Sequence, residues 1–290
     1  MNIKDVAERE IPLSELPQWS PWPARLLGLT EWNTPDRTVD KIENEYNQDK
    51  YLKCLDMAKA EPDTITVQQL RKFEFSLKEG STICVSSEGT LYEVKVEHIL
   101  SLDRTIAVDT LEPMLEKIDT VVEIGCGYGP NLWEIYQKYP DKTYRGGEYS
   151  MNAIEVSKML YKNHPNVTVE YCNFYDDTYN VLEQCAPDSR VLLFTRHAIE
   201  QLPTAEKVLQ TLTKYFDRLA YIVHMEIVNE NSDDTLLGLM RQSYVNANDY
   251  NRDLLGLLQK RDDIEIVSNE PDVSGTNPLN PTSTIVWKPV

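Results

Sequence analysis

The segment from Val121 to Asn131 constrains the fold of this chain more than any other. It consists of a short apolar run that ends in an acid and an isoleucine, three glycines at alternate positions, and residues that can begin a helix. A strand turns directly into a helix around a ligand only where side chains are absent from the turn, and glycine allows both positive φ angles and close backbone approach. The pattern predicts a strand, a ligand-binding loop containing Gly125, Gly127 and Gly129, and a helix.

Alternating strand and helix patterns follow this loop. Helical patterns run from an expected N-cap at Asn131 to about 139, from a cap at Ser150 to about 160, from 204 to 216 and from 234 to 260. Strand patterns cover 143–148, 167–172, 190–195, 219–227, 264–267 and 283–287. Strands that alternate with helices are typical of an α/β fold with a largely parallel sheet and helices on both faces.

An acid ends the second of these strands, about twenty residues beyond the glycines. A carboxylate at this position can accept hydrogen bonds from both ribose hydroxyls of an adenosine, as it does in dinucleotide-binding folds. We therefore expect Glu148 to bind a ribose. The glycine spacing, Gly-x-Gly-x-Gly, differs from the Gly-x-Gly-x-x-Gly of dinucleotide loops, which disfavours a pyrophosphate cradle.

The glycine loop and its acids together resemble the first motifs of class I S-adenosylmethionine (SAM)-dependent methyltransferases. The resemblance covers about residues 111–290 and implies a seven-stranded Rossmann-like sheet, in which the last strand is inserted antiparallel, with SAM as the cofactor. It implies that the end of the third strand meets the adenine, through the amide oxygen of Asn173 and the ring of Phe174 or Tyr175. The residues expected to bind the cofactor are Glu123, Gly125, Gly127, Gly129, Asn131, Glu148, Tyr149, Asn173, Phe174 and Thr195.

Residues 1–110 carry no glycine loop and are expected to form a mostly helical cap or substrate region. A helix is predicted from Thr38 to about Met57, and a hairpin around residues 82–94. A proline-rich stretch, 17–32, holds three of the five tryptophans and cannot form a regular helix before Pro23. This stretch either packs as an arm between the two parts of the chain or forms an aromatic wall over the substrate. We expect the region to contribute more to the acceptor site than to the cofactor site.

Methyl transfer is an in-line displacement, so the protein must hold the acceptor behind the methyl group and, for a hydroxyl, remove its proton. Two segments after the fourth and fifth strands supply residues for this chemistry. His197 titrates near neutrality and is the candidate general base, with Glu200 as its catalytic partner. The candidate substrate-binding residues are Trp22, Arg25, Arg196, His224, Glu226, Arg241 and Tyr244.

The composition limits the partners. Lys and Arg total 29 against 47 Asp and Glu, a formal net charge of −18, which disfavours nucleic acid as the methyl acceptor. A small molecule or a peptide is the better candidate. The five cysteines show no spacing typical of a metal site, so no metal is expected. The sequence also has no apolar run typical of a membrane span or signal peptide, and we expect a cytoplasmic protein without a membrane partner.

Residues 194–203 and 224–226 show a fainter resemblance to bacterial sugar and natural-product O-methyltransferases. This favours transfer of a methyl group to a hydroxyl of a biosynthetic intermediate. Three alternatives stay open. They are methylation of a carboxylate, such as the C-terminus of a modified peptide, gripped by Arg196, Arg241 or Arg25; methylation of an amine; and a SAM-binding protein without catalysis.

Overall fold

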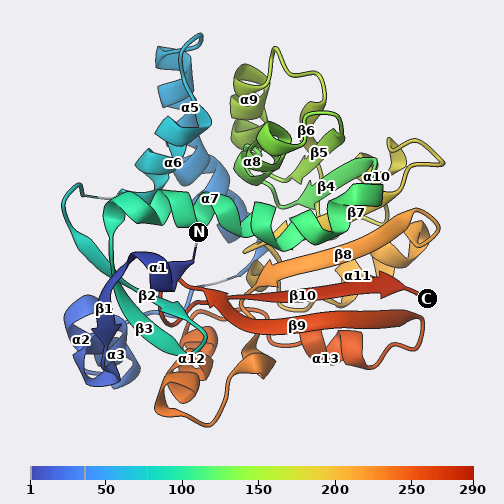
Figure 1. Cartoon of the computed structure of the whole chain (residues 1–290). Coiled ribbons are helices and arrows are strands. Elements are labelled where there is room, and N and C mark those ends of the chain that lie inside the picture. The colour runs from blue at the N-terminus through green and yellow to red at the C-terminus, as the bar shows by residue number, and fades with distance from the viewer. Residues whose placement is uncertain (1, 36, 77) are drawn as a thin grey trace.

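The computed structural model describes residues 2–35, 37–76 and 78–290. Its centre is a seven-stranded sheet in the order β6-β5-β4-β7-β8-β10-β9 (Figure 1). The strands are β4 (Thr120–Ile124), β5 (Thr143–Glu148), β6 (Val167–Tyr171), β7 (Val191–Arg196), β8 (Leu219–Glu226), β9 (Ile264–Ser274) and β10 (Thr282–Pro289). The first five strands are parallel, and β10 is inserted antiparallel between β8 and β9. The expected seven-stranded α/β sheet is therefore confirmed.

The sheet is buried on both faces, because alternate residues of its central strands belong to different apolar clusters. Val121 and Leu192 pack into one cluster, whereas their neighbours Val122 and Leu193 pack into another. Strands buried in this way are almost continuously apolar, which is why β4 and β7 are visible in the sequence. The helices of this part are α8 (Pro130–Lys138), α9 (Met151–Leu160), α10 (Asn180–Glu183), α11 (Glu206–Leu212), α12 (Leu236–Ala247) and α13 (Leu254–Gln259).

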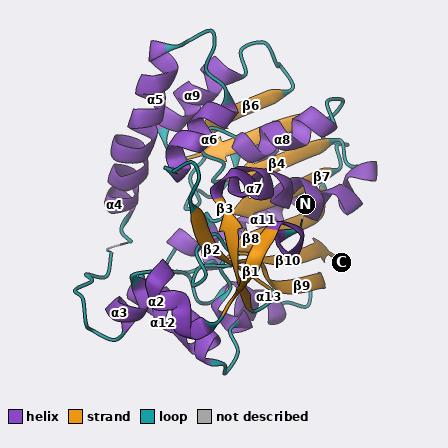
Figure 2. Cartoon of the chain, turned by 60° about the vertical axis from the view of Figure 1, so that its left-hand side comes forward, coloured by secondary structure: helices purple, strands orange, loops and turns teal. Residues whose placement is uncertain are grey.

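The N-terminal region is helical with a small antiparallel sheet in the order β1-β3-β2. Its helices are α1 (Ile3–Val6), α2 (Leu16–Trp19), α3 (Trp22–Leu26), α4 (Val39–Glu43), α5 (Tyr51–Ala60), α6 (Val67–Phe75) and α7 (Val96–Leu111), and its strands are β1 (Ala7–Ile11), β2 (Thr82–Ser87) and β3 (Thr90–Lys95). The predicted hairpin is β2–β3. In Figure 2, α2 and α3 are far from α5 and α6, and α3 lies beside α12 of the C-terminal part.

Two predicted helices differ from those observed, and the proline-rich arm is helical where no regular helix was expected. The helix expected over 38–57 contains a π-helix, Asn44–Lys50, and continues in α5 to Ala60. The stretch 234–260 is divided between α12 and α13. The proline-rich arm forms two short helices, α2 and α3. Each has a proline in its first turn, where a backbone N–H would have no partner within the helix, so the proline costs no hydrogen bond.

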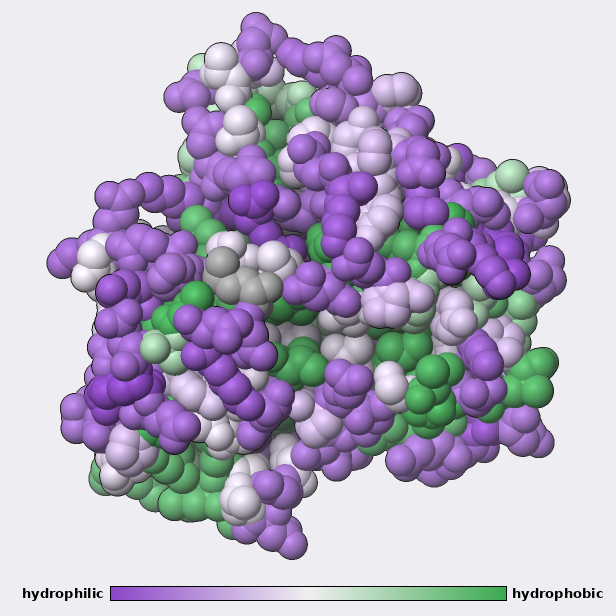
Figure 3. All heavy atoms as spheres, viewed as in Figure 1, coloured by the Kyte–Doolittle hydropathy of each residue, from purple (hydrophilic) through white to green (hydrophobic). Residues whose placement is uncertain are grey.

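The two parts of the chain share one interior. Tyr51, Leu55 and Ala58 of α5 are buried in the same cluster as Ala153 and Ile154 of α9. Polar side chains cover most of the outer face shown in Figure 3, with smaller apolar areas between them. Across the described residues, none of the helices combines the length and the apolar character required to cross a membrane.

Candidate active site

A cavity of about 410 Å³ lies at the carboxyl ends of β4, β5, β6 and β7. The strand order reverses at β4, and ligands of open α/β sheets bind at this switch point. The cavity wall includes many of the residues predicted to bind the cofactor. These are Glu123, Gly125, Gly127, Asn131, Glu148, Tyr149, Asn173 and Phe174.

The glycine loop has the conformation that its sequence predicts. Gly125, Gly127 and Gly129 all have positive φ angles, of 76°, 58° and 82°. A Cβ atom at Gly127 would lie 2.5 Å from the hydroxyl oxygen of Tyr51, so α5 comes close to the loop here. Gly129 is the N-cap of α8 and Pro130 its first residue. The prediction that Asn131 caps this helix is therefore wrong.

Glu148 holds the glycine loop against the next helix. One carboxylate oxygen accepts a hydrogen bond from the Gly127 N–H at 2.6 Å, and the other accepts from the Ser150 N–H at 2.8 Å. Each oxygen keeps a second lone pair, so two hydroxyl groups can still be bound. The side chain is buried, and burial raises the pKa of this carboxyl despite the two N–H donors.

Glu123 is the most unusual acid of the cavity wall. It is 1% exposed; one oxygen accepts from the Asn131 amide at 2.6 Å, and the other has no hydrogen-bond partner among the residues that the structure describes. Burial raises the pKa of its carboxyl to about 8, with the bond from Asn131 and the charge of Arg196 acting in the opposite direction. A buried carboxylate oxygen without a partner fits a cationic hydrogen-bond donor, such as an ammonium group.

The expected adenine end of the cavity lies at the end of β6. Asn173 and Phe174 line it together with Tyr149 and Tyr175. The amide oxygen of Asn173 already accepts the Tyr175 N–H at 3.0 Å, which fixes the orientation of its side chain. This leaves one lone pair of that oxygen for an exocyclic amine.

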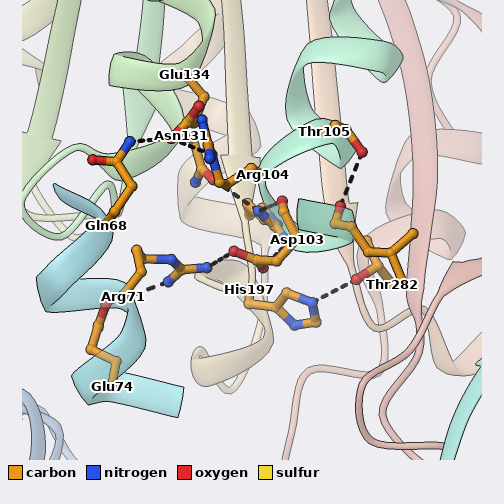
Figure 4. A network of polar contacts seen from close by, with 12 residues as sticks. Gln68, Arg71, Glu74, Asp103, Arg104, Thr105, Asn131, Glu134, His197 and Thr282 are labelled. Atoms are coloured by element: carbon orange, nitrogen blue, oxygen red, sulfur yellow. Dashed lines mark hydrogen bonds and ion pairs between the residues drawn. The ribbon is translucent and has the colours of Figure 1, made fainter. Parts of the chain in front are cut away.

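His197 and Glu200 lie together, as the hypothesis of a catalytic pair requires. The Nδ1 atom of His197 lies 2.8 Å from a carboxylate oxygen of Glu200, and its Nε2 lies 2.7 Å from the hydroxyl of Thr282 (Figure 4). Burial alone would lower the pKa of this histidine, but the carboxylates of Glu200 and Glu226 raise it overall. His197 has a φ of 49°, a left-handed conformation of the kind that is concentrated at functional sites.

Glu226 holds the turn that carries His197. It is fully buried and accepts hydrogen bonds from the backbone N–H groups of Ala198 and Glu200. Burial and the charge of Glu200 raise the pKa of its carboxyl to about 7. It does not line the cavity, so its predicted role in binding substrate is replaced by one in positioning the turn.

Thr195 and His224 lie behind the cavity wall. Both side chains are buried, and the Thr195 hydroxyl is hydrogen-bonded to Nδ1 of His224 at 3.0 Å. Burial lowers the pKa of His224 to about 3. The prediction that Thr195 binds the cofactor and His224 the substrate is not supported by this placement. Strand alternation is the physical reason, because it turns both side chains into the core.

Four other predicted substrate-binding residues also lie outside the cavity lining. Trp22 packs edge-to-face against Tyr244, and Arg25 lies over the Trp22 ring. The stretch 17–32 is therefore a packed arm, because Trp22 is buried against α12 and the indole N–H of the more exposed Trp32 donates to the Ala247 carbonyl of the same helix. Arg241 pairs with Asp272 at 2.8 Å and donates to the Pro278 carbonyl, so it anchors the loop after β9.

Two groups of cavity residues were missed by sequence reasoning. One comes from the N-terminal region and includes Asn47, Lys50, Tyr51, Arg71, Glu74 and Asp103. The other comes from β9, β10 and the loop that joins them: Ser274, Thr276, Asn277, Asn280 and Thr282. Residues of the N-terminal region reach the glycine loop and the start of α9, so this region also contributes to the part of the wall predicted to bind the cofactor. Its expected larger share in the acceptor site stays a prediction.

Asn47 makes the contact with α9. Its side-chain oxygen accepts hydrogen bonds from the Ser150 hydroxyl at 2.7 Å and from the backbone N–H of Asn152 at 2.9 Å. Its backbone carbonyl accepts a hydrogen bond from the side-chain amide of Asn152. Asn47 lies in the π-helix, a structure that is frequent at functional sites. No local sequence signal marks this residue, since both partners lie more than a hundred positions away.

No protein-family model matches the sequence, and no curated protein matches it. Solved structures do resemble it. A SAM-dependent methyltransferase from Anabaena variabilis is 14% identical over 90% of this chain and 99% of that chain, with a TM-score of 0.49. Geranyl diphosphate C-methyltransferase from Streptomyces coelicolor, in complex with S-adenosyl-L-homocysteine, is 10% identical over 68% of this chain and 81% of its own, with a TM-score of 0.48.

An O-methyltransferase family 2 protein from Planctomyces limnophilus, in complex with apigenin, is 10% identical over 61% of this chain and 52% of its own, with a TM-score of 0.43. The strand order, with β10 inserted antiparallel between β8 and β9, is the one that the resemblance in the sequence implies.

Proposed function

We propose that the protein binds SAM in this cavity and catalyses transfer of its methyl group to a hydroxyl oxygen of a small biosynthetic molecule. When bound, SAM supplies an electrophilic methyl group on a sulfonium centre. The chain supplies the binding, the orientation of the acceptor and a base for its proton.

Three features of the cavity fit SAM. Glu148 retains two lone pairs for the ribose hydroxyls, and the glycine loop leaves the space that a ligand needs. Glu123 presents a buried oxygen without a partner, which suits the ammonium group of an amino acid. Asn173 and Phe174 lie at the strand end next to Glu148, where an adenine attached to the ribose would lie.

The contact between His197 and Glu200 carries the proposal of a hydroxyl acceptor. When Nδ1 donates to Glu200, Nε2 is left as the acceptor, and it faces the Thr282 hydroxyl in the cavity wall. An acceptor hydroxyl that replaces the Thr282 hydroxyl as the partner of Nε2 can give its proton to that nitrogen as its oxygen attacks the methyl carbon. The neighbouring carboxylates raise the pKa of His197, so the ring is a stronger base than an isolated histidine.

The acceptor side of the wall favours a neutral group over a carboxylate. The residues that line the cavity around the β9–β10 loop, from Ser274 to Thr282, are uncharged hydrogen-bonding residues. Lys50, Arg71 and Arg196, the lysine and arginines of the described cavity wall, make their ion pairs with acids of α6 and α7 and not with this loop. A carboxylate acceptor beside Thr282 would therefore lose its hydration without gaining a lysine or arginine partner.

The test is a single-turnover measurement of methyl transfer against pH with the true acceptor. His197→Gln should slow the chemical step by about a hundredfold, the usual scale of general-base catalysis. The wild-type rate should rise with pH through an apparent pKa above the ordinary value for histidine, and Glu200→Gln should move that pKa downward. His98→Gln, a change outside the cavity lining, is the matched control. A flat profile with a loss below about threefold would instead favour carboxylate methylation.

A further inference from the structure

A network of buried charges joins the N-terminal region to the cavity wall. Asp103 of α7 accepts a hydrogen bond from Arg71 of α6 through one oxygen (Figure 4) and one from Arg196 of β7 through the other. Arg196 also donates to the Asn131 amide oxygen at 2.8 Å, and Asn131 in turn donates to Glu123. The network therefore ends at the buried acid whose second oxygen has no partner.

The positions of the two acids give the cavity a direction. Glu148, at the end of β5, suits the ribose, and Asn173 follows β6, the strand next to it. Glu123 is at the end of β4, on the other side of Glu148 from Asn173. The amino-acid arm of the cofactor, which extends from the ribose, would thus reach Glu123. That arm carries an ammonium and a carboxylate, and the carboxylate needs a cation.

Arg71 is the cation best placed for this carboxylate. Arg196 is only 8% exposed, and three hydrogen bonds hold its two terminal nitrogens. Lys50 is close enough to Glu148, the acid expected to bind the ribose, for its charge to lower the pKa of that carboxyl. Lys50 is also paired with Glu74. The Arg71 side chain is 18% exposed, lines the cavity, and within the described residues makes two contacts with acids, which leaves N–H donors of its guanidinium available.

We propose that Arg71, a residue of the N-terminal region, binds the amino-acid carboxylate of the cofactor while Glu123 binds the ammonium. The inference rests on the proposed function. It makes the cofactor site composite: the methyltransferase sheet binds the adenosine, and α6 of the N-terminal region binds the far end of the same ligand. Asp103 is then a positioning residue, since it holds the guanidiniums of Arg71 and Arg196 side by side.

The experiment compares two ligands by calorimetry. S-adenosylhomocysteine carries the amino-acid arm, and 5′-methylthioadenosine lacks it. Arg71→Met should weaken S-adenosylhomocysteine about tenfold or more and leave 5′-methylthioadenosine within about threefold of wild type. Lys72→Met is the matched control: it removes a cation from the same helix, but one that pairs with Glu79 on the surface, and neither affinity should change.

Equal losses for both ligands, or no loss for either, would overturn the role of Arg71. If Arg71→Met does not fold, the wild-type protein answers the same question, because replacing the carboxylate of S-adenosylhomocysteine by a carboxamide should cost about tenfold in affinity. An unchanged affinity for that amide would contradict the inference. Failure of the wild-type protein to bind S-adenosylhomocysteine would refute the proposed function itself, so the two failures are distinguishable.

Discussion

Glu123 shows how one buried atom at the residue scale links structure to ligand binding. Burial raises the pKa of its carboxyl to about 8, and one of its oxygens has no donor within the described part of the chain. Burying an ionised carboxylate without a partner costs free energy. Such acids are therefore concentrated at functional sites, where a cation can bind to them. The sequence places an acid at this position, but only the structure reveals that half of its hydrogen-bonding capacity is unused.

The first prediction is that cofactor binding releases a proton from Glu123. At pH 7 the group is mostly protonated in the free protein, and an ammonium beside it lowers its pKa, so binding ionises it. The affinity for S-adenosylhomocysteine should therefore rise with pH and level off above about pH 8. Calorimetry in two buffers of different ionisation enthalpy measures the released protons. The wild type should release up to about one proton more than Glu123→Gln. Equal release from both proteins would contradict the assignment.

At the scale of elements, the contact between α5 and the glycine loop is the most informative. Tyr51 begins α5, immediately after the π-helix that carries Asn47, and its hydroxyl lies where a side chain on Gly127 would be. The glycine thus serves two functions: it adopts a positive φ angle, and it leaves space for a residue of the N-terminal region. The sequence predicts the first function, whereas the second depends on a contact between distant segments.

A double substitution tests this contact. Gly127→Ala should reduce the affinity for S-adenosylhomocysteine about tenfold, because the new methyl group displaces Tyr51 and the φ of 58° is strained for alanine. Tyr51→Phe in the same protein removes the oxygen nearest the new Cβ and should restore part of the lost affinity. Gly256→Ala is the matched control, since a Cβ there meets its nearest neighbour at 3.6 Å. If Tyr51→Phe restores nothing, the loss comes from the backbone strain alone.

The parts of the fold that the sequence predicts are those encoded locally. The apolar strands, the glycine turn and the Ser150 cap all depend on neighbouring residues, and all are observed. Candidate site residues that follow a strand directly, such as Glu148 and His197, could be placed at the cavity wall from the sequence, whereas their roles stay predictions. Arg71 and the β9–β10 loop have no local signature, because their roles depend on segments brought together by the tertiary fold.

The whole molecule is held together by an interior that both parts of the chain share. Leu55 and Ala58 of α5, Leu70 of α6 and Leu111 of α7 are all buried in the cluster that covers one face of the main sheet. Removing residues 1–110 would therefore expose part of that cluster to water and remove wall residues of the cavity. The division at residue 110 follows the sequence motifs more closely than it follows the packing.

The prediction for the whole molecule is that residues 111–290 alone do not unfold cooperatively on heating and do not bind S-adenosylhomocysteine measurably. Adding residues 1–110 as a separate chain should restore both properties, at least in part, because the lost surfaces are complementary. Differential scanning calorimetry and titration of the two fragments, apart and together, provide the measurements. A fragment 111–290 that melts cooperatively and binds with the affinity of the full chain would show that the N-terminal region is dispensable for the fold and for the cofactor site.

The antiparallel insertion of β10 has a consequence for how the chain reaches this structure. β9 is made before β10, and within the described seven-stranded sheet its neighbour is β10, so it cannot join that sheet when it is synthesised. Until residues 282–289 arrive, the edge of β8 and an eleven-residue strand both have unpaired backbone groups. Closing this gap is a non-local step, and such steps are slow and leave exposed edges open to association with other chains. The late strand is therefore where folding and aggregation compete.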